Sequence, residues 1–393
     1  MKPAFLIAAF LAFSPIQAVA QSSDNSLVAA ANSGDPAAQF QLAEKLRIGI
    51  GVLQDYSAAA KLYAASAAQG NYDSQASLGA LLIQGLGVQQ DAETGFGLLV
   101  SAANSGKAEH YFTLATAYLD GAGTARDPSK AAEYFERAVQ QNHIPAMVAL
   151  GTLYQNGDGV EQDIERAAEL YAPAVKAGHP RAQNNLGLIY ACGEVVDQDY
   201  ELAREFFELA AQAGLAEGLK NLAALYQNGF GVEVDEDRAN ALLRIAAQGD
   251  ADGNSGAISF LKDPRLPAPD PAQSEYYAST AQFGDPISLF QLANLIVNGA
   301  QTSTDYRSAA RAYKAAAEKG LPAAMANLGI LSFAGKGVLQ DYVDGYAWMT
   351  LAAAGGITDA IGIRDQFRSS MTVDQINQAN ALANARLKDL QEN

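Results

Sequence analysis

The feature that most constrains this chain is a repeat of constant length. The glycine that begins a Gly-x-Gly triplet, or its remnant, recurs at 49, 85, 121, 157, 193 and 229, and again at 299 and 335. Within each of these two runs the step is 36 residues. An aspartate keeps the same register, at 55, 91, 127, 163, 199, 235, 305 and 341. A period of roughly 20 to 50 residues predicts a solenoid, in which each unit packs on its neighbours.

Each unit is predicted to form two helices. Seven residues before each loop glycine there is a leucine, such as Leu150, and the next residue is always alanine or glycine. A large residue such as Tyr154 follows four positions after the leucine, on the same helical face. After the aspartate, a second segment shows alanine at helical spacing around a bulky centre. The pattern therefore predicts helix A, a loop, helix B and a glycine turn in each unit.

The loop sequence YQNGDGVEQD (154–163) could indicate a calcium loop, a phosphate cradle or a structural turn. A calcium loop would need ligands in every copy, yet the residue between the glycines varies freely. No strand precedes the glycines, which argues against a nucleotide fingerprint. We therefore expect a structural turn, in which Gly157 ends helix A, Gly159 lets the chain turn back and Asp163 caps helix B.

The units AMVALGTLYQNGDGVEQD (146–163) and AAMANLGILSFAGKGVLQD (323–341) carry a family resemblance. Their pattern resembles the Sel-one-like repeat family, a relative of the tetratricopeptide repeat, over about residues 35–356. The resemblance implies an all-α, right-handed superhelical solenoid of about nine helix-turn-helix repeats, with the A helices on its concave side. It also implies an adaptor scaffold, because members of this family serve as non-enzymatic scaffolds with diverse partners.

The chain divides by this register. Residues 35–249 form six repeats, 285–356 form repeats eight and nine, and 21–34 are an N-terminal lead-in. Residues 250–284 are a degenerate repeat, because four prolines in 263–271 prevent a helix. Its start, DADGNSG, partly resembles a calcium loop but lacks the required glycine and glutamate, so we expect a polar turn. Residues 357–393 leave the period and are expected to form a C-terminal cap beginning at a Thr372–Gln375 capping box.

The N-terminal residues predict export. A short positive start precedes an apolar run at 4–13, and Ala18-Val19-Ala20 places small residues where a signal peptidase cuts. We expect cleavage of residues 1–20 and a periplasmic or secreted protein. The net charge of −17 disfavours binding to nucleic acids and to anionic lipid. Cys192 has no second cysteine to pair with, and we expect it to be a buried small residue.

No catalytic, metal or cofactor site is predicted. His143 and His179 lie one period apart, so their helices would be about 10 Å apart, whereas zinc ligands approach the metal to roughly 2 Å. We interpret both as surface turn residues. His110 occupies a helix A position that is usually small, which suggests burial at a locally loosened junction. The periodic carboxylates are expected to be helix caps, and no cofactor is expected.

The predicted partner site lies on the concave side of the A helices, assigned by register to tetratricopeptide-like arrays. Its aromatic members suit a protein or peptide partner, because rings supply contact area and amides pair with backbone. The alternative is that differences between units bury these side chains as ordinary core. The candidate residues are Phe40, Arg47, Phe112, Gln155, Asn184, Gln227, Phe290 and Phe333.

The function that follows is an exported, non-enzymatic scaffold that binds a protein or peptide, with regulation of an envelope enzyme or receptor as its purpose. A structural component of a cell-envelope assembly, for polysaccharide export or wall remodelling, is the second hypothesis. A wall-metabolism hydrolase is the third, but this chain lacks the cysteines of the secreted branch linked to that activity.

Overall fold

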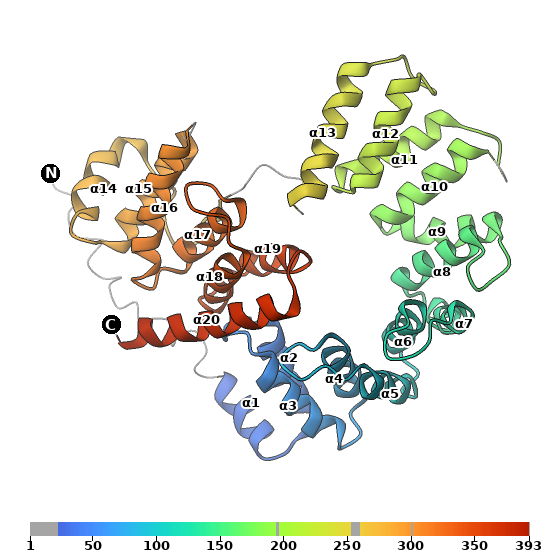
Figure 1. Cartoon of the computed structure of the whole chain (residues 1–393), viewed down its shortest axis with the longest axis horizontal. Helices are drawn as coiled ribbons and strands as arrows, with labels where there is room; N and C mark the ends of the chain where they lie inside the picture. The colour runs from blue at the N-terminus through green and yellow to red at the C-terminus, as the bar shows by residue number, and fades with distance from the viewer. Residues whose placement is uncertain (1–22, 194–195, 253–259, 300–301, 393) are drawn as a thin grey trace. The chain divides into compact units, whose positions relative to one another are not determined.

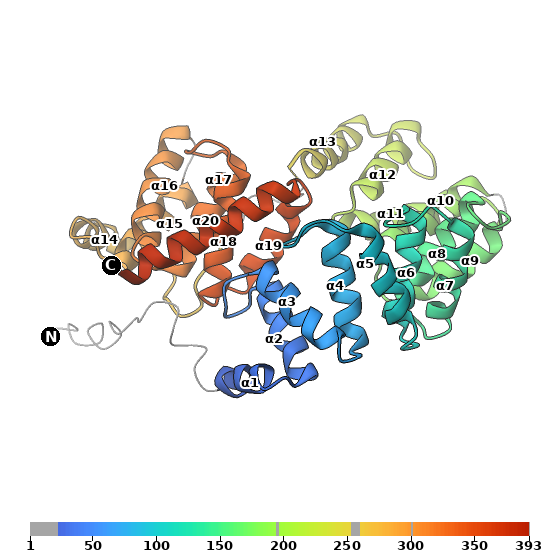
Figure 2. The same ribbon diagram turned by 60° about the horizontal axis from the view of Figure 1, so that its bottom comes forward.

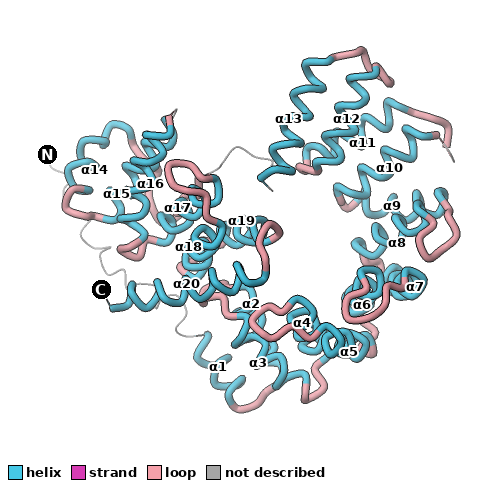
Figure 3. Tube along the Cα trace, in the orientation of Figure 1, coloured by secondary structure: helices cyan, strands magenta, loops and turns pink. Residues whose placement is uncertain are grey.

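The computed structural model describes residues 23–392 apart from 194–195, 253–259 and 300–301. Every regular element in this part of the chain is a helix, as Figure 3 shows, so the all-α prediction is confirmed. The predicted signal sequence lies outside the described residues, as do Asn254 and Ser255 of the calcium-loop-like segment.

The helices alternate as the repeat predicts. The A helices are α2 (Pro36–Ile48), α4 (Tyr72–Gln84), α6 (Ala108–Asp120), α8 (Ile144–Asn156), α10 (Pro180–Cys192), α12 (Ala216–Asn228), α15 (Pro286–Gly299) and α17 (Pro322–Ala334). The B helices are α3 (Tyr56–Ala67), α5 (Ala92–Ala103), α7 (Pro128–Val139), α9 (Ile164–Lys176), α11 (Tyr200–Gln212), α13 (Glu236–Asp252), α16 (Ser303–Ala317) and α18 (Tyr342–Ala354). The remaining elements are α1 (Ser23–Asn32), the 3-10 turn η1 (Pro271–Gln273), α14 (Ser274–Ala281), α19 (Asp359–Arg368) and α20 (Val373–Glu392).

These helices form two compact units. Unit 1 takes its described residues from Met1–Ser66, Leu86–Val88 and Ile258–Asn393, and unit 2 from Ala67–Gly85 and Gln89–Ala257. Within unit 2 the helix pairs stack in chain order from α4 to α13 (Figure 1). Unit 1 combines the first repeat with repeats eight and nine and the C-terminal helices.

The loop glycines and aspartates act as the sequence predicts in most repeats, but Gly299 is the last residue of α15 and is not one of the glycines with positive φ. Gly157 adopts a left-handed conformation with φ of 68° and its N–H donates to the carbonyl of Leu153, which ends α8. The carboxylate of Asp163 accepts a hydrogen bond of 2.8 Å from the backbone N–H of Arg166 and caps α9. At Asp305 the prediction is wrong: Thr302 is the N-cap of α16, and Asp305 is its partner in a capping box.

Replacing Asp163 by alanine should lower the free energy of unfolding by about 0.5–2 kcal/mol, because the first turn of α9 loses a side-chain acceptor. Chemical denaturation of unit 2 measures this change. Glu161→Ala is the control, since Glu161 is exposed in the same loop and does not cap α9. Equal losses in the two variants would contradict a capping role for the aspartate.

The second loop glycine has a packing role that the sequence did not reveal. A Cβ on Gly159 would lie 2.4 Å from the carbonyl carbon of Pro128, at the start of the preceding B helix. A Cβ on Gly123 would lie only 1.9 Å from the carbonyl oxygen of Ala92. Gly51, in the first repeat, has nothing within 4 Å. The second glycine therefore lets each of these later loops touch the preceding repeat.

Small residues in the A helices let the B helices approach closely. A Cβ on Gly151 would lie 2.7 Å from the ring of Tyr171, and one on Gly187 would lie 2.8 Å from the ring of Phe207. The leucines beside these positions, such as Leu114 and Leu150, are buried and form the core between repeats. The predicted A–B packing is therefore present in the described repeats.

The lead-in and the cap complete unit 1. Gly34 lies 36 residues before Gly70 and shares its positive φ, so α1 stands where a B helix would precede the first repeat. At the other end, α20 lies against α18 in both Figure 1 and Figure 2. The guanidinium of Arg386 sits 4.0 Å above the ring of Trp348. The capping box of Thr372 and Gln375 forms both of its hydrogen bonds, which confirms the predicted start of this helix.

Within unit 1 the first repeat packs on the last one. Arg364 of α19 is fully buried and donates a 2.7 Å hydrogen bond to the carbonyl of Ile48, at the end of α2. The hydroxyl of Tyr346 donates a 2.9 Å hydrogen bond to the side chain of Gln54. These contacts join residues about 300 positions apart, so the fold of unit 1 depends on both ends of the chain.

Candidate functional site: an amide row on the A helices

Three of the eight predicted partner residues are buried. Phe290 is 2% exposed and its ring centre lies 5.9 Å from that of Tyr313. Phe333 is 1% exposed and stacks on Phe367 at 3.9 Å. Asn184 is also buried and accepts a 2.8 Å hydrogen bond from Asn221. The expectation that these three side chains face a partner is therefore corrected, because each packs against neighbouring elements.

The other five predicted residues keep an exposed part. Phe40, Arg47, Phe112 and Gln155 are half-buried, and Gln227 is exposed. The Phe112 ring lies 5.0 Å from the ring of His143, and the Arg47 guanidinium pairs with Glu44 at 2.7 Å. Phe40 and Arg47 belong to unit 1, and Phe112, Gln155 and Gln227 belong to unit 2.

A different column of the A helices carries the clearest binding geometry. Eight residues before the first loop glycine, an amide side chain recurs in successive repeats of both units. This column lies one position from the predicted one and was not predicted from the sequence. The sequence feature that could have revealed it is the recurrence of amides at a position where the repeat pattern does not require an amide. We define the amide row as Asn185 of α10, Asn221 of α12, Gln291 of α15 and Asn327 of α17.

In unit 1 the amide row binds the backbone of a non-helical segment of the chain, residues 260–270. Asn327 accepts a 2.7 Å hydrogen bond from the N–H of Leu261 and donates a 3.1 Å hydrogen bond to its carbonyl. Gln291 donates a 2.8 Å hydrogen bond to the carbonyl of Pro267. Both amides are nearly completely buried, at 0% and 1% exposure. The degenerate repeat thus supplies a non-helical segment, which turns at 264–266, to the amides of these two A helices.

A buried tyrosine supports the row in both units. The hydroxyl of Tyr313 donates 2.7 Å to Asn294, and Asn327 contacts the same Asn294 oxygen at 3.4 Å. In unit 2, Asn185 donates 3.1 Å to the hydroxyl of Tyr171. Burial raises the pKa of both tyrosines, so the hydroxyls stay protonated. Asn185 therefore lies against Tyr171 much as Asn327 lies near Tyr313.

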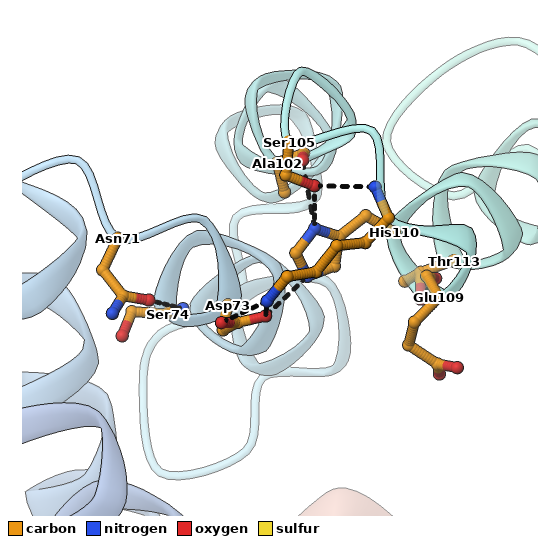
Figure 4. A network of polar contacts seen from close by, with 9 residues as sticks. Asn71, Asp73, Ser74, Ala102, Ser105, Glu109, His110 and Thr113 are labelled. Carbon is orange, nitrogen blue, oxygen red and sulfur yellow. Dashed lines mark hydrogen bonds and ion pairs between the residues drawn. The ribbon is translucent and has the colours of Figure 1, made fainter. Parts of the chain in front are cut away.

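A second polar network joins α4, α5 and α6, as shown in Figure 4. The side chain of His110 is buried, and its Nε2 lies 3.1 Å from a carboxylate oxygen of Asp73. Its Nδ1 lies 2.6 Å from the hydroxyl of Ser105 and 3.1 Å from the carbonyl of Ala102. The ammonium of Lys107 contacts both Asp73 oxygens at 2.7 Å. The order Ser105–His110–Asp73 superficially matches a hydrolase triad.

The contacts of this network favour a structural role. A carbonyl can only accept, so the contact with Ala102 requires a proton on Nδ1, which then cannot act as a base toward Ser105. The Ser105 hydroxyl accepts from the backbone N–H of Lys107, and Asp73 is shared with a lysine. His143 and Glu109 repeat the A-helix ion pair in the next unit at 2.9 Å. We interpret the network as a clamp between successive repeats.

The other residues singled out from the sequence, His143, His179 and Cys192, lie at the ends of A helices. His143 lies at the start of α8, where its ring nitrogen accepts a 3.2 Å hydrogen bond from Ala146. Burial lowers the pKa of His179, which begins α10. Cys192 is exposed, so its predicted burial is wrong; it is the last residue of α10 and reaches the loop. Among the described residues, no group of three or more His, Cys, Asp or Glu could hold a metal ion.

Comparison with known families identifies the repeat. The Sel1 repeat matches residues 36–71, 73–107, 109–143, 144–179, 180–215, 216–250, 286–321 and 322–357. The chain belongs to the Sel1 repeat family. The matches leave out 251–285, which include the non-helical residues 260–270. Sel1 repeat solenoids generally act as scaffolds for protein–protein interaction and are typically non-catalytic.

Several solved structures are similar to this chain. A Sel1 repeat protein from Oxalobacter formigenes is 24% identical, with a TM-score of 0.51 over 58% of this chain and 88% of that one. The c5321 protein, a protective antigen of uropathogenic Escherichia coli with an SLR fold, is 26% identical over 94% of this chain and 87% of its own, with a TM-score of 0.38. The immunity protein Pa5087 from Pseudomonas aeruginosa is 19% identical over 61% and 90%, with a TM-score of 0.37. Comparison with curated proteins gave no match.

Within the part of the chain that the structure describes, no helix combines the length and apolar character needed to cross a membrane.

Proposed function

We propose that this Sel1 repeat protein is an exported scaffold that binds a protein or peptide partner on the faces of its A helices. The observation that carries the proposal is that Gln291 and Asn327 hydrogen-bond to the backbone of a non-helical segment of the same chain. Peptide recognition by hydrogen bonds to the main chain is a general binding mode. The A helices of this chain therefore already perform, within the molecule, the contact that a scaffold makes with a partner.

The N-terminal sequence supports export, which is the part of the proposal that concerns location and the kind of partner. The apolar run at 4–13 and the Ala18-Val19-Ala20 site favour export, so the partner would be an enzyme or receptor of the cell envelope. Mass spectrometry of the protein isolated from the producing cell should find an N-terminus near Gln21. A mature protein that retains Met1 in the cytosol would contradict the envelope location.

Cross-linking in intact cells, followed by capture of the full chain, tests the scaffold role. We expect one partner to be enriched and to bind the purified protein directly and saturably. The variant Gln212→Ala serves as a control that should capture the same partner, since Gln212 is an exposed amide on α11 outside the amide row. A purified candidate that shows no direct binding, with no other protein enriched, would contradict the proposal.

A further inference from the structure

We infer that the face of α10 and α12 that carries Asn185 and Asn221 is a binding site for a non-helical, cationic segment of a partner protein. This inference deepens the proposed function and rests on it. The site lies entirely within unit 2.

The recognition chemistry is already present in unit 1. Asn327 both accepts from and donates to the backbone of one residue, Leu261. These hydrogen bonds recognise main-chain atoms and therefore do not depend on a particular side chain. Gln291, one repeat earlier, donates a hydrogen bond to a second carbonyl, that of Pro267, which lies six residues further along the same segment. Two amides in adjacent repeats thus hold one non-helical segment on either side of its turn at 264–266.

Asn185 and Asn221 form the same pair in unit 2. They lie 36 residues apart in adjacent repeats, as Gln291 and Asn327 do, and in the same register before the loop glycine. The backbones of α10 and α12 follow the same repeat, and Tyr171 supports Asn185 with a 3.1 Å hydrogen bond. The two pairs should therefore present their amides to a chain segment in the same way.

The unit 2 amides retain hydrogen-bonding capacity. Both are half-buried, whereas their unit 1 counterparts are almost fully buried beside the bound segment. Asn221 donates to Asn184 at 2.8 Å, and Asn185 donates to Tyr171 and accepts from Asn184 at 3.3 Å. A carboxamide has two N–H donors and two acceptor lone pairs, so each side chain can make further hydrogen bonds.

A hollow continues the site along α10. Its volume is about 180 Å³, and its walls include Leu188 and Cys192, which follow Asn185 on one helical face. Gln155 and Ile164 of the preceding repeat line the opposite side. The Tyr171 hydroxyl donates 2.8 Å to Gln155, so hydrogen bonds link the hollow to Asn185. Asn156 and Gln162 also line this space, which has room for one side chain of a partner segment.

Charge selects the kind of segment. Residues 67–257 carry 26 Asp and Glu against 11 Lys and Arg, so this stretch holds −15 of the total charge of −17. The remainder of the chain is therefore close to neutral. A field of one sign attracts an oppositely charged partner and speeds its association. The occupant that fits is a non-helical segment with a net positive charge, not a nucleic acid or an acidic peptide.

The test uses a synthetic peptide derived from the segment that unit 1 holds. The probe has the sequence of residues 260–270 with Asp263→Asn and Asp270→Asn, which leaves Lys262 and Arg265 as its charges. Fluorescence anisotropy of the labelled peptide with the full chain should show saturable binding, weakened by added salt. The protein variant Asn185→Ala/Asn221→Ala should weaken binding at least tenfold, while Gln212→Ala, an exposed amide on α11, should change it less than twofold.

Several outcomes would overturn the site. One is the absence of peptide binding at millimolar concentration. Another is unchanged binding in the double variant with its melting temperature retained; Asn221→Ala alone replaces it if the double variant unfolds. If the double variant still binds the natural partner as the wild type does, the site is overturned while the scaffold role stands. Failure of the wild-type protein to bind any partner directly would overturn the scaffold role itself.

Discussion

Replacing Arg364 by alanine should lower the free energy of unfolding of unit 1 by about 3–5 kcal/mol. The change removes a fully buried side chain, leaves a cavity and deprives the Ile48 carbonyl of its donor. The guanidinium also lies 5.7 Å from the ring centre of Tyr346, a contact that is lost as well. Chemical denaturation followed by tyrosine and tryptophan fluorescence measures the loss. Arg307→Ala is the control, because Arg307 is exposed on α16.

The same variant distinguishes this fold from a simple linear array. In a linear solenoid each repeat contacts only its neighbours, so a change in α19 would leave the first repeat untouched. Here Arg364 holds the end of α2, so backbone amides of α2 should exchange hydrogen faster in Arg364→Ala under native conditions. Unchanged exchange in α2 with faster exchange in α19 would contradict the coupling between the two ends of unit 1.

Replacing Gly159 by alanine should cost about 2–4 kcal/mol. The residue has φ of 75°, where a Cβ adds strain of about 1 kcal/mol or more, and the new Cβ would meet the backbone of Pro128 at 2.4 Å. Overpacking against a backbone atom adds about 1–3 kcal/mol, because the partner helix must shift. Thermal and chemical unfolding of the variant measure the sum of these two effects.

Gly51→Ala separates the two effects. Gly51 has a similar φ of 67° but nothing within 4 Å of a Cβ, so only the conformational strain should appear there. We expect its loss to be smaller than that of Gly159→Ala by at least about 1 kcal/mol. Equal losses at the two positions would show that the second loop glycine has no role in packing between repeats.

The fold could be predicted because its determinants are local and periodic. Gly157, Asp163 and Leu150 act within one repeat, so their spacing alone places the end of α8, the start of α9 and the core between them. The capping box at Thr372 is also a local signal, and it forms as expected. A period repeated eight times made each of these assignments easy to check against the others.

The candidate site could be predicted only in part, because its contacts are not periodic. Phe333 is covered by Phe367 of α19, a helix outside the repeat. The repeat pattern therefore did not indicate that Phe333 is buried. The contact between Leu261 and Asn327 spans 66 residues and involves backbone atoms, which leave no mark on composition. Only the recurrence of amides from Asn185 to Asn327 was visible in the sequence. Its role in binding a backbone became clear only from the contacts between unit 1 and its own segment.

The most direct test of partner binding is to observe the side-chain amides of the row while a partner binds. Nuclear magnetic resonance of the full chain labelled at asparagine, titrated with the cationic peptide or the captured partner, should shift the side-chain signals of Asn185 and Asn221. The signal of Asn104, exposed at the end of α5, should stay in place. Saturable binding that leaves both signals unchanged would contradict the claim that the A-helix amides bind a partner's backbone.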